Sequence, residues 1–368
     1  MSSDPRRAEL DAKVLEWIEE PLWGTDDERF DTLALALFAF QFEHCLPYRR
    51  FCENRGRTPE DVQTWVEIPP VPTGAFKEMP LHSFPADRLA HVFRTSGTSL
   101  ERRGELHLDT LALYEASLLV PFQRFLLPDL HTDREPLIYA LAPSPAEVRD
   151  SSLSHMFAVA IREIGAEGSR FFLSDGGLEL DALLEAMDRV PTDRPVLLGG
   201  TAFAFVHLVD ALAQRNARLE LPVSVRIMET GGFKGRSRSM PRPELYERLE
   251  DALGVSVDRI VNQYGMTELG SQFYDSILRE PGAVRRKLAP PWTRVRIVEP
   301  ASHRDVSAEA TGTLVITDLA NTGSISAIQT ADLGRSILEG FEVLGREPGA
   351  EERGCSIAAD ELLDTGKT

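Results

Sequence analysis

Short apolar runs alternate with longer amphipathic runs from residue 90 onward, and this alternation constrains the fold more than any other feature. The short runs have the length of buried strands, whereas the longer runs repeat apolar residues at helical spacing. Strands that alternate with helices build an α/β fold around a mainly parallel sheet. The expected strands cover residues 137–141, 196–199 and 223–229, and the expected helices cover residues 178–190, 202–215 and 242–253.

The two ends of the chain follow other patterns. Residues 1–90 are expected to be mainly helical, because apolar residues recur at helical spacing there, most clearly in residues 30–46. Prolines near residue 70 interrupt this pattern. Residues 294–298 and 312–317 predict a small β-rich layer. The expected parts are a helical region packed on the body at 1–90, an α/β core at 90–290, a β-rich subdomain at 291–340 and a short tail at 341–368.

The chain carries 58 acidic and 40 basic side chains, which give a formal net charge of −18. This charge argues against a nucleic-acid surface, which needs clustered lysines and arginines. An acidic chain can still bind ATP where backbone dipoles and Mg²⁺ supply a positive field. The simplest consequence of the charge is solubility.

The cysteines and the apolar runs indicate where the protein works. The three cysteines are Cys45, Cys52 and Cys355, an odd and sparse set that is typical of reduced thiols. The N-terminal residues lack the apolar segment of a signal peptide, and the longest apolar runs are too short to cross a bilayer. We therefore expect a cytoplasmic protein without a membrane span.

A hydroxyl-rich loop follows the apolar pair Val92-Phe93. It consists of Thr95-Ser96-Gly97-Thr98-Ser99. Backbone N–H groups and hydroxyls of such a loop can hold the β- and γ-phosphates of ATP, and its glycine lets the backbone approach closely. The alternative interpretation is a solvated turn between a strand and a helix.

Two further segments add to this loop. In Tyr264-Gly265-Met266-Thr267-Glu268, the tyrosine ring can stack on adenine, Thr267 can bond the α-phosphate and Glu268 can bind Mg²⁺. The same residues also fit a strand end followed by an N-capped helix. Asp332, placed in an expected tight turn, can accept both ribose hydroxyls or can be an ordinary turn aspartate.

These segments, in this order, resemble the adenylate-forming superfamily of acyl-CoA synthetases, adenylation domains and luciferases over residues 90–346. The resemblance implies a fold like the N-terminal domain of those enzymes, with layered α/β sheets and a small β-rich subdomain. It also implies ATP and Mg²⁺ as cofactors. The implied nucleotide-binding residues are Thr95, Ser96, Gly97, Thr98, Ser99, Gly231, Gly232, Tyr264, Gly265, Thr267, Asp332 and Arg335, with Glu268 holding the metal.

A narrower resemblance covers the whole chain. Residues 93–99, 150–156, 229–236, 318–321, 327–334 and 353–356 are similar to the acyl-protein synthetases of bacterial luminescence. In that family a fatty acid and ATP give acyl-AMP and pyrophosphate, and the acyl group passes to a cysteine and onward to a partner reductase. The matching position is Cys355, whose thiolate is a suitable nucleophile. The alternative for Cys355 is a small buried cysteine.

The chain departs from the wider superfamily near its C-terminus. The usual lid domain is expected to be absent or reduced to the tail, and the lid lysine is missing with it. That lysine offsets charge during adenylation, so another cation must replace it. Lys234, after the Gly231-Gly232 turn, is our candidate, with Arg236 and Arg238 as alternatives, although Lys234 also fits a surface position.

Three further residues are candidates for the acyl pocket. His155 lies in a polar stretch with apolar flanks, although a structural role is the more common one for a lone histidine. Phe203 and His207, in one expected helix with Phe205, can line an acyl tunnel or can simply pack. No His and Cys residues have the spacing of a zinc site.

We therefore expect an AMP-forming acid–thiol ligase that acts as an acyl-protein synthetase. Its catalytic residues would be Lys234, Cys355 and Glu268. Its partner would be an acyl-accepting protein such as an acyl reductase or a carrier protein. Two alternatives stay open: a ligase that delivers an aryl or short acyl group to coenzyme A or a carrier, and a non-catalytic ATP-binding subunit.

Overall fold

The computed structural model describes residues 4–95, 102–130, 134–174, 177–192, 194–231, 240–300 and 302–346. It divides into two compact units. Unit 1 comprises Met1–Val120, Met266–Gln272 and Leu288–Thr368, and unit 2 comprises Pro121–Gly265 and Phe273–Lys287. The boundaries that we expected at residues 90, 290 and 340 stay a prediction.

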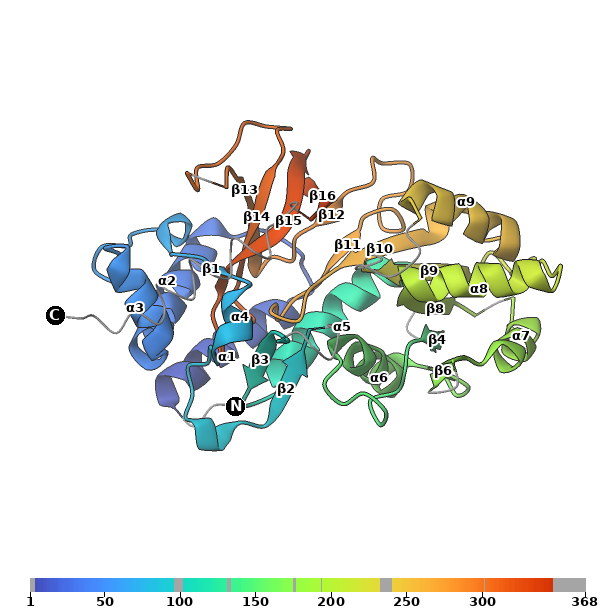
Figure 1. Ribbon diagram of the computed structural model, residues 1–368, viewed down its shortest axis with the longest axis horizontal. Coiled ribbons are helices and arrows are strands. Elements are labelled where there is room, and N and C mark those ends of the chain that lie inside the picture. Colours follow the sequence, from blue (N-terminus) through green and yellow to red (C-terminus); the bar gives the residue numbers. More distant parts are fainter. Residues whose placement is uncertain are drawn as a thin grey trace. The chain divides into compact units, whose positions relative to one another are not determined.

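Unit 1 begins with the expected helices, labelled in Figure 1. They are α1 (Pro5–Glu19), α2 (Asp27–His44), α3 (Leu46–Asn54) and the short α4 (Ala75–Glu78). The helical pattern of residues 30–46 breaks at Cys45, which is extended, because Pro47 occupies the first turn of α3 and starts a new helix. The hairpin of β2 (His91–Arg94) and β3 (Glu105–Leu108) precedes α5 (Ala112–Leu126).

The rest of unit 1 is the expected β-rich layer. Its strands are β13 (Thr293–Val298), β14 (Gly312–Asp318), β15 (Ala327–Ile337) and β16 (Gly340–Arg346), which pair antiparallel in that order. The short strand β1 (Val71–Pro72) adds to β15 in parallel. Strand β12 (Lys287–Leu288) lies where the chain passes between the units.

Unit 2 contains the predicted α/β sheet. Its strands run in the order β11 (Phe273–Asp275), β10 (Ile260–Tyr264), β9 (Val225–Thr230), β8 (Val196–Thr201), β4 (Leu137–Leu141) and β5 (Arg170–Phe171). All neighbouring pairs are parallel except β10 with β11. A separate small hairpin joins β6 (Leu173–Ser174) to β7 (Gly177–Leu178).

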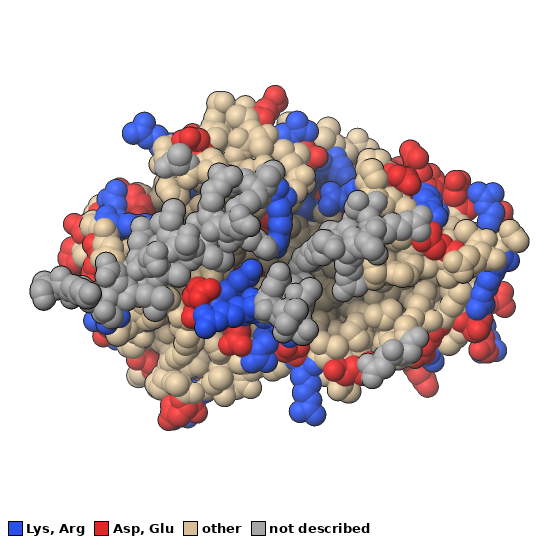
Figure 2. Space-filling view, viewed as in Figure 1, with Lys and Arg blue, Asp and Glu red and all other residues tan. Residues whose placement is uncertain are grey.

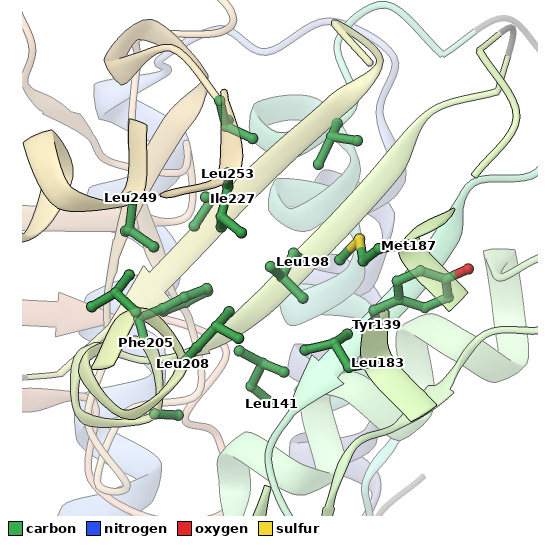
Figure 3. Close-up of a cluster of buried hydrophobic side chains, with 14 of the residues drawn as sticks. Tyr139, Leu141, Leu183, Met187, Leu198, Phe205, Leu208, Ile227, Leu249 and Leu253 are labelled. Atoms are coloured by element: carbon green, nitrogen blue, oxygen red, sulfur yellow. The ribbon is translucent and has the colours of Figure 1, made fainter. Parts of the chain in front are cut away.

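Helices cover both faces of this sheet. These helices of unit 2 are α6 (Ser152–Ile164), α7 (Leu180–Asp188), α8 (Ala202–Gln214) and α9 (Arg242–Leu253). Alternate strand residues such as Leu141, Leu198 and Ile227 form a buried cluster with Phe205 of α8 and Leu249 of α9 (Figure 3). The other face packs on α6, since a Cβ built at Gly199 would lie 2.5 Å from the Phe157 ring. The expected alternation is therefore confirmed.

None of the described helices is both long and apolar enough to cross a bilayer. On the face drawn in Figure 2, acidic and basic side chains are interspersed. The mixture on this face is consistent with the expected solvated surface, because charges of both signs favour solubility.

Candidate active site

The β2–β3 hairpin fixes Thr95 at the start of the hydroxyl-rich loop. Strand β2 is anchored by Phe93, which is fully buried against Tyr114. Thr95 donates from its backbone N–H to the Gly104 carbonyl at 2.9 Å, and its hydroxyl oxygen accepts the Gly104 N–H at 2.9 Å. Because this oxygen is the acceptor, its own proton can be donated to a ligand. The loop joins two strands and not a strand to a helix.

Glu268 reaches the same point as Thr95. A Cβ atom built on Gly104 would lie 3.2 Å from Glu268 Oε1 and 3.6 Å from Thr95 Oγ1. The absence of a side chain at Gly104 leaves room for both the carboxylate and the hydroxyl beside its backbone. The two residues, 173 positions apart in sequence, belong to unit 1 and present two hard oxygen donors together. Such donors fit Mg²⁺, which needs few protein ligands beside substrate phosphates.

No helix follows Tyr264 in residues 265–272, so the N-capped helix that we considered there is not formed. The turn at Thr267 and Glu268 in unit 1 is instead held by hydrogen bonds from side chains that are distant in sequence. Asn321 donates from Nδ2 to the Glu268 carbonyl at 2.7 Å, and Ser117 donates from its hydroxyl to the Gly270 carbonyl at 2.6 Å. Thr267 and Glu268 are both buried, at 8% and 5% exposure. The position of Glu268 therefore depends on side chains distant in sequence.

Asp318, the last residue of β14, is the second anchor of this turn. Its carboxylate accepts the Ser271 N–H at 2.7 Å and the Ser271 hydroxyl at 2.8 Å. Trp292 donates from Nε1 to the same hydroxyl at 2.9 Å. Complete burial raises the pKa of Asp318 to about 6, against the opposing effect of these hydrogen bonds.

Gln41 of α2 links the segment that holds Glu268 to the helical region. Its side chain is fully buried, donates to the Asn321 carbonyl at 3.0 Å and accepts the Ser326 N–H at 3.0 Å. Sequence reasoning assigned no role to Asp318, Asn321 or Gln41. The sequence signal that could have found them is a polar residue in strongly apolar surroundings. Such a residue is expected to form hydrogen bonds with other buried polar groups.

Asp332 lies within strand β15 and not in a tight turn, so that expectation was wrong. Gly334 suggested the turn, but this glycine is needed where strands approach: a Cβ there would lie 2.7 Å from the Glu342 carbonyl and 2.7 Å from Leu314 Cδ2. The pairing register shifts between Leu333 and Gly334, which makes a bulge. Asp332 Oδ1 lies 3.6 Å from Arg346 Nε.

Arg335 is engaged on the same strand. It pairs with Glu342 of β16 at 2.7 Å, and both side chains are exposed. The ion pair occupies the guanidinium that we expected at the nucleotide. Its role as a nucleotide-binding residue stays a prediction.

In unit 2 the ends of β9 and β10 are joined by a buried polar network. Glu229 accepts hydrogen bonds from Tyr246 Oη at 2.8 Å and from Asn262 Nδ2 at 2.7 Å. Lys287 donates to Asn262 Oδ1 at 2.6 Å and to Asp275 Oδ1 at 3.0 Å. The network fixes the strand end from which Thr230 and Gly231 continue. Sequence reasoning missed it because its members come from separate strands and from α9.

Burial and ion pairing have opposite effects on the pKa values of the charged groups in this network. Burial raises the pKa of Glu229 and lowers the pKa of Lys287, because both lose water around their charged forms. Burial also acts to raise the pKa of Asp275, but Lys287 and then Arg285 outweigh it and hold this pKa below its usual value.

Gly231 follows the last residue of β9 and has a φ of +75°, a conformation that favours glycine.

Tyr264 and the three acyl-pocket candidates also lie in unit 2. Tyr264 ends β10, partly buried, with its ring 6.1 Å from that of Phe273. Phe203 and His207 contact each other on α8, with ring centroids 4.4 Å apart and His207 exposed, whereas His155 is on α6. Because α6 and α8 cover opposite faces of the sheet, the structure does not bring His155 and His207 together.

Several expected site residues lie outside the described residues. They are Ser96, Gly97, Thr98, Ser99, Gly232, Lys234, Arg236, Arg238 and Cys355. Within the ranges that the structure describes, no group of three or more His, Cys, Asp or Glu side chains is placed to hold a metal ion. A magnesium ion here would depend on Glu268, Thr95 and the phosphates of ATP.

The family model for acyl-protein synthetase, LuxE, matches residues 2–364. The long-chain-fatty-acid–luciferin-component ligase of Aliivibrio fischeri is 22% identical over 357 residues, which cover 93% of this chain and 91% of that protein. The protein of the same name from Vibrio harveyi is 21% identical over 317 residues, covering 85% and 81%.

Solved structures share the fold. A 2-hydroxyisobutyryl-CoA ligase, in an open conformation with 2-HIB-AMP and CoA, has a TM-score of 0.62 at 17% identity, covering 88% of this chain and 76% of that one. ATP-bound MatB from Rhodopseudomonas palustris has a TM-score of 0.50 at 18% identity, covering 72% and 49%. These likenesses confirm the predicted fold class of the adenylate-forming enzymes.

Proposed function

The chain belongs to the LuxE family of acyl-protein synthetases, and we propose that Thr95 and Glu268 form its adenylation centre. The enzyme is an AMP-forming ligase that activates a fatty acid with ATP and then transfers the acyl group. This membership favours the enzyme over the non-catalytic ATP-binding subunit. The observation that carries the proposal is the meeting of the Thr95 hydroxyl and the Glu268 carboxylate at Gly104.

In the first step a carboxylate oxygen of the fatty acid attacks the α-phosphorus of ATP. The bond between the α-phosphorus and the bridging oxygen breaks, and pyrophosphate leaves with that oxygen. The Thr95 hydroxyl donates to a phosphate oxygen, and Glu268 with Thr95 would hold Mg²⁺. When bound, Mg²⁺ supplies positive charge that stabilises the phosphates.

The other nucleotide contacts follow from the expected roles. Asp332 accepts from the ribose hydroxyls, and the ring of Tyr264 stacks on adenine. Lys234 supplies the cation that the lid lysine provides elsewhere in the superfamily. Catalysis then rests on positioning and charge neutralisation.

In the second step a thiolate attacks the carbonyl carbon of acyl-AMP. The bond from this carbon to the phosphate oxygen breaks, AMP leaves and a thioester forms. We propose Cys355 as the thiol, with a partner acyl reductase as the next acceptor. The alternative acceptors are coenzyme A and the thiol of a carrier protein.

A labelled-acid experiment tests both steps. Long-chain, short-chain and aryl acids are supplied with ATP and Mg²⁺, and pyrophosphate release and protein-bound label are measured. Long-chain acids should release pyrophosphate fastest, and Cys355→Ser should abolish the protein-bound label while acyl-AMP still forms; Cys45→Ser is the matched control. Label retained on the Cys355→Ser protein would contradict the assignment of Cys355.

A further inference from the structure

Unit 2 has an open cavity of about 500 Å³ at the edge of its sheet where the parallel strands begin. Strands β4, β8 and β9 start at Leu137, Val196 and Val225. The cavity is lined by residues near these starts, among them Arg134, Pro195 and Ser224. Thr230 and Gly231 follow at the other end of β9, which is six residues long. Such a strand spans about 20 Å, so the cavity is distinct from that end of the sheet.

The charge of this cavity is opposite to that of the whole chain. Four arginines line it, and one carboxylate, that of Asp129, faces them. They are Arg134, Arg194, Arg226 and Arg259. Arg226 is only 1% exposed and binds both oxygens of Asp129, so these two charges neutralise each other. Arg194 and Arg259 then leave the cavity with an excess of positive charge.

One of these arginines, Arg259, lies close to another positive charge, and a second, Arg194, has no partner of its own in the described part of the chain. Burial lowers the pKa of Arg259, repulsion from Arg226 lowers it further, and Asp129 offsets only part of this effect. Among the residues that the structure describes, Arg194 makes no hydrogen bond or ion pair. An anion in the cavity that both arginines line would be stabilised by their charges.

Unused hydrogen-bond donors point to the same conclusion. In the described part of the chain, Arg226 Nε and the Ser224 hydroxyl are buried and have no hydrogen-bond partner. A buried donor without a partner is costly and calls for a ligand. The planar guanidinium matches phosphate in particular, since its N–H groups bind two oxygens at once.

We propose that this cavity binds a phosphate oxyanion through Arg194, Arg259 and Ser224. A volume of about 500 Å³ lies in the range of small-molecule sites and exceeds the size of a single phosphate. The ligand class is therefore a diphosphate, either free as inorganic pyrophosphate or carried by a nucleotide. None of the residues that line the cavity is among the proposed adenylation residues, so the proposal does not depend on their assignment.

Arginine modification by phenylglyoxal, mapped by mass spectrometry, tests the site directly. Inorganic pyrophosphate and ADP are used as the two probes on the full-length protein. Both sources should slow the modification of Arg194, and protection by ADP at lower concentration than pyrophosphate would identify a nucleotide as the source. Arg189, an exposed residue paired with Glu185 outside the cavity, is the internal control and should react equally with or without either probe.

Calorimetric titration with pyrophosphate complements the mapping. Arg194→Ala should weaken binding at this site about tenfold, because one charge-assisted contact is lost, whereas Arg189→Ala should leave it unchanged. The affinity of Arg194→Lys for pyrophosphate should lie between those of the two alanine variants, since lysine keeps the charge but lacks the paired N–H donors. Unchanged reactivity of Arg194 with both probes would overturn the proposal. Protection of Arg194 by polyglutamate alone would also overturn it, and would assign the cavity to an acidic protein surface.

Discussion

The side-chain amide of Asn321 donates a hydrogen bond of 2.7 Å to the backbone carbonyl of Glu268. Both groups are buried, and the same amide also donates to the Ile325 carbonyl at 3.1 Å. The proposed metal ligand is thus positioned through its backbone by a residue 53 positions further along the chain. Asn321 is a positioning residue in this account, because it acts on the reaction through Glu268.

Replacing Asn321 by leucine should leave a folded protein whose adenylation activity needs more Mg²⁺. Asn321→Leu leaves two buried carbonyls without this donor, and each costs about 1–3 kcal/mol of stability. Because Glu268 then shifts, the Mg²⁺ concentration needed for half-maximal pyrophosphate exchange should rise severalfold. Gln63→Leu, at an exposed amide, is the control. An unchanged Mg²⁺ requirement in a folded Asn321→Leu protein would show that this hydrogen bond does not position the metal ligand.

A methyl group at Gly104 should separate Thr95 from Glu268. The new Cβ in Gly104→Ala would lie 3.2 Å from Glu268 Oε1 and 3.2 Å from Thr95 Cγ2, closer than ordinary contact. We expect a raised KM for ATP and a fall of about tenfold or more in pyrophosphate exchange, since small displacements at a reacting centre are costly. Gly24→Ala is the matched control, because nothing lies within 4 Å of a Cβ there. Equal activity of the two variants would contradict the arrangement.

The buried carboxyl of Asp318 should make stability depend on pH. Its pKa rises from 3.8 to about 6 on folding because of burial. The folded protein therefore holds this proton more tightly, and the contribution of Asp318 is complete below pH 3.8 and is lost as the pH rises through about 6. The size of this loss is about 3 kcal/mol.

Urea denaturation of the wild type and Asp318→Asn isolates this contribution. The free energy of unfolding of the wild type, relative to the variant, should fall as the pH rises from 3.8 to about 6 and should stay level at higher pH. Fluorescence of Trp292, which donates to Ser271 beside this carboxyl, is a suitable local signal. A difference between the two proteins that stays constant over this range would rule out the raised pKa.

Local patterns in the sequence were enough to predict six of the elements of unit 2, namely three strands and three helices. The predicted helix at 242–253 coincides with α9, and the predicted strand at 137–141 coincides with β4. Apolar periodicity determines these elements, because each one must bury one face against its neighbours. Asp332 was misplaced because Gly334 has the local signature of a turn but serves close strand packing.

The candidate site was only partly predictable. Motif order pointed to Thr95 and Glu268, and the structure brings these two together. Asn321, Asp318 and Gln41 support Glu268 through contacts that local sequence does not reveal, since their hydrogen-bond partners lie up to 285 positions away. Long-range polar contacts of this kind become visible only when the chain is folded.

Acid-dependent exchange of labelled pyrophosphate into ATP tests the adenylation centre most directly. Thr95→Val, Glu268→Gln and the double variant are compared with Glu163→Gln, a change at an exposed ion pair. Each single variant should lose about 100-fold or more in exchange, and the double variant should lose much less than the product of the two, because the residues act on the same phosphates and metal. Exchange at the wild-type rate in Glu268→Gln, or independent effects of the two changes, would contradict the proposed centre.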